Sequence, residues 1–159
     1  MSAILARLEA FEVRVPLPQP LQMGANVLYD REYTIVRAHD EEGNFGAVYG
    51  LSRNAPLSEI ITRLVAPRWE KQKLDDHEHF YRNLVKASMF LGTNGLFWRS
   101  LSLADCALYD LLAKRTGVPL CEYLGGQVKP TDTLLAGCYP VPSETSETLT
   151  ELMHHMTSY

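Results

Sequence analysis

Alternation of apolar and polar side chains predicts three strands in the first fifty residues. Apolar side chains at every second position of 11–15 indicate a half-buried strand. Segments 33–38 and 45–50 contain the β-branched residues, aromatic residues and alternation that are typical of two further strands. Gly43, in the acidic turn 40–44 that joins them, can adopt the positive φ that a tight hairpin needs. The pattern therefore predicts a three-stranded antiparallel meander, which requires helices packed on it for stability.

Prolines at positions 16, 18 and 20 predict the end of the first strand. Proline has no backbone N–H to donate to a sheet ladder, and Gly24 follows soon afterwards. We therefore expect an extended loop that begins at Pro16 and continues through a mobile, exposed tip at 23–26.

Helical periodicity replaces the alternation after the predicted sheet. Residues 60–65 and 80–89 each carry one apolar face, which predicts two amphipathic helices. Asp75 and Glu78 have the spacing of a capping box at the start of the second helix. Residues 100–116 are apolar nearly all round, as expected of a central buried helix, and a glycine follows where it should end. Strands followed by helices indicate an α+β domain.

The end of the chain has a different pattern. Residues 133–139 are a short apolar run typical of a strand, and a loop is expected over 140–143. Apolar residues over 149–156 then recur with helical spacing. A strand, a loop and an amphipathic helix predict one β/α unit.

Composition and charge exclude several classes of protein. The chain has 159 residues, of which 46% are hydrophobic, so it can form a core without metal or disulfide support. Its net charge of −4 and its lack of basic runs argue against a nucleic-acid or membrane partner. The high apolar content excludes intrinsic disorder, and no apolar stretch is long enough to cross a bilayer.

The cysteines and the N-terminus point to the cytoplasm. Cys106, Cys121 and Cys138 are odd in number and have no C-x-x-C spacing, so we expect buried small hydrophobes in a reducing compartment. The first residues lack the pattern of a signal peptide, which also favours a cytoplasmic location.

Other chemistry-bearing residues fit structural roles better than catalytic ones. His77 and His79 lie two apart on a predicted helix and therefore on different faces, so a shared metal is not expected. Asp105 and Asp110, on the central helix, are expected to hold Lys114, Arg99 or loop amides in structural hydrogen bonds. Phosphate-binding glycine motifs are absent from the sequence.

The densest group of motifs lies in 99–126. It reads Arg99-Ser100, Asp105-x-Ala107-Leu108-Tyr109-Asp110, Lys114, Gly117-x-Pro119-Leu120 and Leu124-Gly125-Gly126. This stretch resembles the cap-domain helix of the mandelate racemase/muconate lactonizing subgroup of the enolase superfamily, in which glycine usually stands where this chain has Ala113. Upstream, Tyr33 to Arg37, Asp40-x-x-Gly43 and Gly46-x-x-Tyr49-Gly50 are similar to the family's cap hairpin.

The resemblance implies a specific domain organisation. Residues 1–126 would form an α+β cap domain, a three-stranded antiparallel meander followed by a helical bundle. Residues 127–159 would form a linker and the first β/α unit of an incomplete TIM-type barrel. Because such a barrel needs about 250 residues, the strands that carry the family's base and Mg²⁺ ligands have no counterpart here. We therefore expect no catalytic residue and no metal ligand in this chain, which would be inactive alone.

The resemblance also implies a chemistry and a set of binding residues. The family removes a proton α to a carboxylate with the help of Mg²⁺, and acid-sugar dehydration or racemisation is the first expectation for the complete enzyme. The cap would shape specificity through two loops, one carrying Met23 and Asn26 and the other carrying Tyr49 and Arg53, while Tyr139 would line the site from the barrel strand. For each residue a bland alternative stays open: a flexible surface loop, a solvated charge, or a packed aromatic ring.

Two hypotheses about function follow from the sequence. In the first, the chain is the cap and first barrel unit of a Mg²⁺-dependent lyase or isomerase. Its partners would be a small carboxylate substrate and either further copies or a second polypeptide that supplies the barrel. In the second, it is a free-standing α+β module for binding or oligomerisation. The apolar face predicted over 149–156, which has no barrel to pack on, favours the first.

Overall fold

The computed structural model describes residues 3–23, 25–92, 94–132 and 154. Three strands, β1 (Leu5–Met23), β2 (Asn26–Asp40) and β3 (Phe45–Leu51), form one sheet in the order β1-β2-β3. Strands β2 and β3 are antiparallel, with Tyr33 opposite Leu51 and His39 opposite Phe45. The predicted three-stranded meander is therefore confirmed. The β/α unit expected over 133–156, apart from residue 154, lies outside the described residues.

The predicted loop from Pro16 is wrong, because β1 continues through the prolines to Met23. Strand β1 is at an edge of the sheet, where a residue whose nitrogen points away from β2 loses no ladder hydrogen bond. The three prolines occupy alternate positions, so their nitrogens point to the same side of the strand. Because β2 begins at Asn26, only residues 24 and 25 of the expected loop lie outside the two strands.

The turn between β2 and β3 is built on one buried carboxylate. Asp40 Oδ1 accepts hydrogen bonds from the backbone N–H groups of Glu42 (3.0 Å) and Asn44 (2.8 Å), and Oδ2 accepts from Asn44 Nδ2 and from Arg115. Burial alone raises the pKa of Asp40, but the hydrogen bonds from Asn44 and Arg115 outweigh it and lower the pKa below its ordinary value of 3.8. Gly43 has the predicted positive φ, 90°.

The helices follow the sheet in chain order. They are α1 (Leu57–Ile60), a π-helical turn η1 (Ile61–Val65), α2 (Ala66–Trp69), the 3₁₀ turns η2 (Leu74–Asp76) and η3 (Met89–Leu91), α3 (His77–Ala87), α4 (Leu96–Thr116) and α5 (Leu120–Tyr123). The predicted capping box does not form: α3 begins at His77 without a side-chain cap, and Asp75 lies in η2. The central helix begins earlier than predicted, at Leu96.

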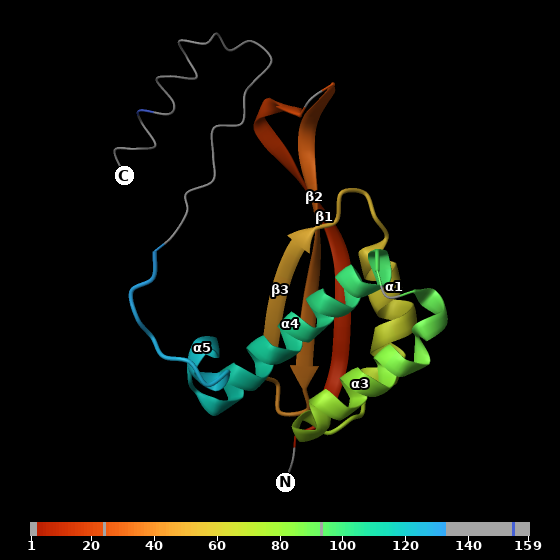
Figure 1. The fold of residues 1–159 in the computed structure, drawn as a ribbon, viewed down its shortest axis with the longest axis vertical. Helices are drawn as coiled ribbons and strands as arrows, with labels where there is room; N and C mark the ends of the chain where they lie inside the picture. Colours follow the sequence, from red (N-terminus) through yellow and green to blue (C-terminus); the bar gives the residue numbers. More distant parts are fainter. Residues whose placement is uncertain (1–2, 24, 93, 133–153, 155–159) are drawn as a thin grey trace. The chain divides into compact units, whose positions relative to one another are not determined.

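Helix α4 lies across the inner face of the sheet (Figure 1). Val36 and Ala38 of β2 are fully buried, as are Leu101, Ala104 and Leu108 of α4. A Cβ atom on Gly46 would lie 2.2 Å from the carbonyl oxygen of Ala107 and from the backbone nitrogen of Leu111, so only glycine allows this approach. The predicted central buried helix is confirmed. None of the described helices is long and apolar enough to cross a membrane.

The prediction of buried cysteines is wrong for the two that the structure describes, because Cys106 and Cys121 are exposed. Cys106 follows Ala104 and precedes Ala107, both buried, so helical geometry turns it away from the sheet. Cys121 lies on α5, none of whose residues is buried. Cys138 lies outside the described residues.

The chain divides into two compact units. One comprises Met1–Val13 and Glu32–Val128, and the core and the pocket described below belong to it. The other comprises Arg14–Arg31 and Lys129–Tyr159. Within it, Arg14 of β1 forms an ion pair of 3.4 Å with Asp30 of β2.

Candidate functional site

A pocket of about 940 Å³ opens where β3 ends. Its walls come from the end of β3, the loop that leads to α1, and the N-terminal half of α4. The lining residues are Gly50, Leu51, Arg53, Leu57, Asn94, Gly95, Trp98, Arg99, Ser102 and Leu103. Segments far apart in the sequence thus build one concavity.

The turn Ser52–Ala55 carries Arg53 at the edge of this pocket. The Ala55 N–H donates to the Ser52 carbonyl (3.1 Å), which closes the turn. Arg53 and Asn54 both have positive φ, 55° and 59°, as the central residues of a type I′ turn do. Asparagine adopts this conformation readily, whereas for arginine it costs about 1–3 kcal/mol, and such strain is concentrated at functional sites. The surrounding contacts must therefore impose this backbone.

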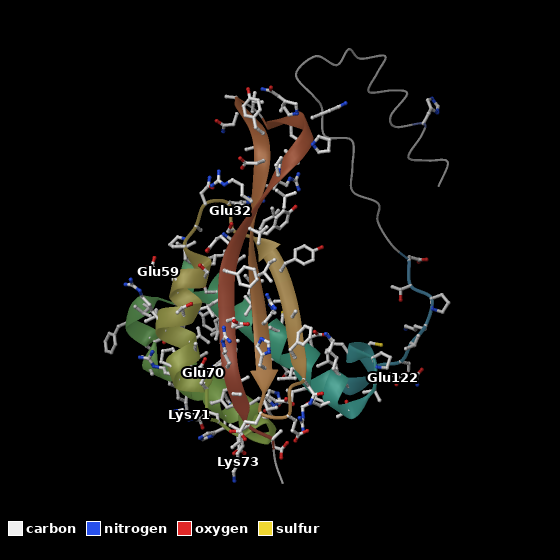
Figure 2. All side chains as sticks on the ribbon, turned by 180° about the vertical axis from the view of Figure 1, so that it is seen from behind. Glu32, Glu59, Glu70, Lys71, Lys73 and Glu122 are labelled. Carbon is white, nitrogen blue, oxygen red and sulfur yellow. The ribbon has the colours of Figure 1, made fainter. Side chains whose placement is uncertain are left out.

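Hydrogen bonds from Ser52 anchor the turn to the sheet. Ser52 is fully buried; its N–H donates to the Glu32 carbonyl (3.0 Å) and its hydroxyl to Glu32 Oε1 (2.8 Å). Glu32, labelled in Figure 2, lies near the end of β3. The carboxylate of Glu32 is thus used for the turn, and it does not line the pocket.

The charged side chains that line the pocket are Arg53 and Arg99. Arg99 donates a hydrogen bond to the Leu51 carbonyl, whereas Arg53 has no ion pair with any residue that the structure describes. Asn94 and Ser102 add neutral hydrogen-bonding groups, and none of the described residues that line the pocket is acidic or a histidine. Guanidinium groups bind carboxylates with two parallel hydrogen bonds. The two guanidinium groups therefore make the pocket suited to binding an anion.

Of the five residues predicted to bind substrate, the structure brings one to this pocket, Arg53. Tyr49 is 71% exposed and contacts Tyr33 edge to face, 5.8 Å between ring centroids, outside the pocket lining. Met23 ends β1 and Asn26, which is exposed, begins β2. Tyr139 lies outside the described residues.

Sequence reasoning missed three side chains of the pocket. Asn94 and Trp98 carried no motif, and Arg99 was considered only as a partner for acidic residues. The signal that pointed to Arg99 was its place at the start of the motif-rich stretch 99–126.

The acidic residues of α4 are structural, in part as predicted. Asp110 accepts hydrogen bonds from the Ala47 N–H (2.8 Å) and from Lys114 (2.7 Å). Burial raises the pKa of Asp105, and the nearby His77 offsets part of this rise. The His77 ring packs edge to face on Tyr109, with 5.0 Å between ring centroids. These contacts join α4 to β3 and to α3 and lie outside the pocket.

Comparison with known proteins finds relatives of this chain. No family model matches the chain. It is 28% identical over 114 residues to a putative L-rhamnonate dehydratase of Caldivirga maquilingensis, covering 71% of this chain and 27% of that protein. It is 29% identical over 126 residues to a chloromuconate cycloisomerase of Cupriavidus pinatubonensis, covering 77% of this chain and 34% of that protein.

Solved structures agree with these relatives. A mandelate racemase/muconate lactonizing enzyme-like protein from Rubrobacter xylanophilus matches 98% of this chain and 42% of its own, with a TM-score of 0.73 and 20% identity. The chain is related to the mandelate racemase/muconate lactonizing enzymes of the enolase superfamily. An enolase from Bradyrhizobium, complexed with magnesium and mandelic acid, matches 82% of this chain and 37% of its own, with a TM-score of 0.72 and 23% identity.

The chain spans 27% and 34% of the length of the two curated relatives above. Within the described residues it contains no group of three or more histidine, cysteine, aspartate or glutamate side chains that could hold a metal ion. Mg²⁺ prefers carboxylate oxygens in an octahedral arrangement. The described residues therefore do not offer a site that fits a magnesium ion such as the one in the Bradyrhizobium protein.

Proposed function

We propose that this chain is the specificity-determining cap of a Mg²⁺-dependent enolase-superfamily enzyme that removes the α-proton of a small carboxylate substrate. Acid-sugar dehydration is the first reaction to test, because a relative that is 28% identical is a putative L-rhamnonate dehydratase. Racemisation is the second, because a neighbour of the same fold was crystallised with mandelic acid. On this proposal the chain binds and selects the substrate, and barrel residues beyond this chain transfer the proton.

The observation that carries the proposal is Arg53, which lies on a turn with positive φ, lines the pocket and forms no ion pair with a described residue, in a pocket whose described lining includes no acidic residue. A guanidinium held without a carboxylate partner is ready to bind one from a ligand. The absence of acids and histidine from the pocket lining separates this role from proton transfer. Met23, Asn26, Tyr49 and Tyr139 stay candidates for further contacts with the substrate.

The proposed division of the chain is the one that the family resemblance implies. Residues 1–126 are the cap, and 127–159 are the linker and the first β/α unit of the barrel. The barrel would complete the site, supplied as further sequence or by a second polypeptide, and the assembly could be a homo-oligomer. Mg²⁺, bound by that barrel, would stabilise the negative charge that develops on the substrate carboxylate.

A second function, a free-standing binding module, is favoured by one observation. The unit of Met1–Val13 and Glu32–Val128 has a continuous core of its own that joins sheet and helices. A protein of this kind would need no barrel. It would also have no reason to prefer a carboxylate at Arg53, so the two functions differ in a measurable property.

The test is a titration of the ¹⁵N-labelled chain with L-rhamnonate, monitored by NMR. The chain has two tryptophans, Trp98 in the pocket lining and Trp69 fully buried in the core, which serve as reporter and internal control. We expect L-rhamnonate to shift the Trp98 indole signal and leave that of Trp69 unchanged, whereas the neutral sugar L-rhamnose shifts neither.

Arg53→Gln should weaken L-rhamnonate binding at least about tenfold, the effect of losing a charged hydrogen bond. The matched control is Arg82→Gln, which removes an exposed arginine of α3 outside the pocket. Equal affinity of the wild-type protein and Arg53→Gln, or equal binding of L-rhamnose, contradicts the proposed role of Arg53.

A further inference from the structure

Two adjacent residues of α4 hold the two ends of the loop that carries Arg53. The Arg99 guanidinium donates to the carbonyl of Leu51, the last residue of β3. The Ser100 hydroxyl donates to the carbonyl of Leu57, the first residue of α1, at 3.2 Å. The turn Ser52–Ala55 lies between these two points, so α4 brackets it from both sides.

The bracket is anchored in the rigid part of the molecule. Ser100 is fully buried, and Leu101 and Ala104, which follow it on α4, are fully buried as well. Helix α4 in turn packs closely on Gly46 of β3. The backbone of Arg99 and Ser100 is therefore held by the packed core, while the Arg99 side chain itself is exposed.

The loop needs support from other residues because part of its backbone has an unfavourable conformation. Arg53 has a left-handed conformation that residues other than glycine, asparagine and aspartate adopt mainly when their surroundings impose it. Strand β3 is at an edge of the sheet, so the Leu51 carbonyl depends on a partner from outside the sheet. Arg99 supplies that partner.

We propose that Arg99 is a positioning residue, which acts with Ser100 to hold the Ser52–Ala55 turn and so presents Arg53 to the ligand. The binding of a ligand by Arg53 rests on the proposed function above, whereas the effect of Arg99 on the turn does not. A side chain that bound the ligand only by its charge would leave the turn unchanged when removed. A positioning residue controls the turn even when no ligand is present.

Hydrogen exchange of the full chain, followed by NMR without ligand, separates these roles. In Arg99→Ala we expect the Ala55 N–H, which closes the turn, to exchange about tenfold faster, as expected for the loss of one net hydrogen bond. Ser100→Ala should have an effect in the same direction. Arg99→Lys keeps a donor of similar reach and should restore most of the protection. Arg82→Ala is the matched control and should leave the turn unchanged.

Hydrogen exchange of core amides in the same variants shows whether the change is local. The proposal requires faster exchange at Ala55 in Arg99→Ala while the amides of Leu101 and Ala104 keep their protection. Unchanged exchange at Ala55 in Arg99→Ala overturns the positioning role, whatever Arg53 does. Equal loss of protection in turn and core overturns it too, because the effect is then global. If exchange behaves as expected but L-rhamnonate fails to bind, the proposed function fails and the positioning of the turn stands.

Discussion

Single side chains of α4 complete the exposed edge of the sheet. Strand β3 has no neighbour on its outer side among the described residues, and an open edge invites pairing with other chains. Asp110 accepts from the Ala47 N–H at 2.8 Å, and Arg99 donates to the Leu51 carbonyl. Both residues belong to the motif-rich stretch, so part of that motif serves to protect a strand edge.

Asp40 makes the stability of the protein depend on pH. Burial raises the pKa of Asp40, but hydrogen bonds from Asn44 and Arg115 lower it by a larger amount, so the folded pKa lies below 3.8. The stabilisation is therefore fully present above the pKa of the unfolded state and is lost as the pH falls through the lower folded value. We expect Asp40→Asn to reduce the free energy of unfolding by about 2 kcal/mol at neutral pH and by less at pH 3.

Urea unfolding at both pH values measures this difference. Glu122→Gln, an exposed acid on α5, is the control and should change the free energy of unfolding by less than about 0.5 kcal/mol. A loss of stability in Asp40→Asn that is the same at both pH values would show that the charge of Asp40 contributes nothing.

At the scale of elements, the contact between β3 and α4 depends on two glycines with different neighbours. A Cβ on Gly46 meets the backbone of Ala107 and Leu111 at 2.2 Å, and helix backbone cannot yield. A Cβ on Gly50 meets only the flexible end of Leu103, at 2.8 Å. We expect Gly46→Ala to lower the free energy of unfolding by about 3 kcal/mol or more and Gly50→Ala by about 1 kcal/mol.

Thermal or urea unfolding of the two variants checks this order. If Gly50→Ala were as harmful as Gly46→Ala, the close contact of α4 with the backbone of β3 would be contradicted.

The elements themselves were largely predictable from the sequence, and the errors have physical causes. Periodicity located three strands and the central helix, because each buries one face. The prolines at 16, 18 and 20 predict the end of β1 from the sequence, although their alternate spacing suits an edge strand. Whether a strand lies at the edge of a sheet depends on the tertiary fold, which the pattern of residues in that strand does not reveal. The hydrophobic character of Cys106 predicts burial, but its position on α4 places it on the exposed face of the helix.

At the scale of the whole molecule, the pocket could be predicted only in part. Arg53 was predicted as a substrate contact from the loop that follows β3, and it lines the pocket. Asn94, Trp98 and Arg99 were not, because their meeting with that loop depends on how α4 crosses the sheet. The part of the fold matched by enolase-superfamily relatives supplies the pocket but no acid, base or metal group within it.

The proposed function requires that this chain selects a carboxylate but does not perform the proton transfer. The most direct test incubates the purified chain with L-rhamnonate and Mg²⁺ in D₂O and follows the ligand by ¹H NMR. Saturation of protein signals should transfer to L-rhamnonate in the wild-type protein and much less in Arg53→Gln, while the α-proton signal keeps its full intensity. Loss of the α-proton signal, or transfer that does not depend on Arg53, would contradict the account.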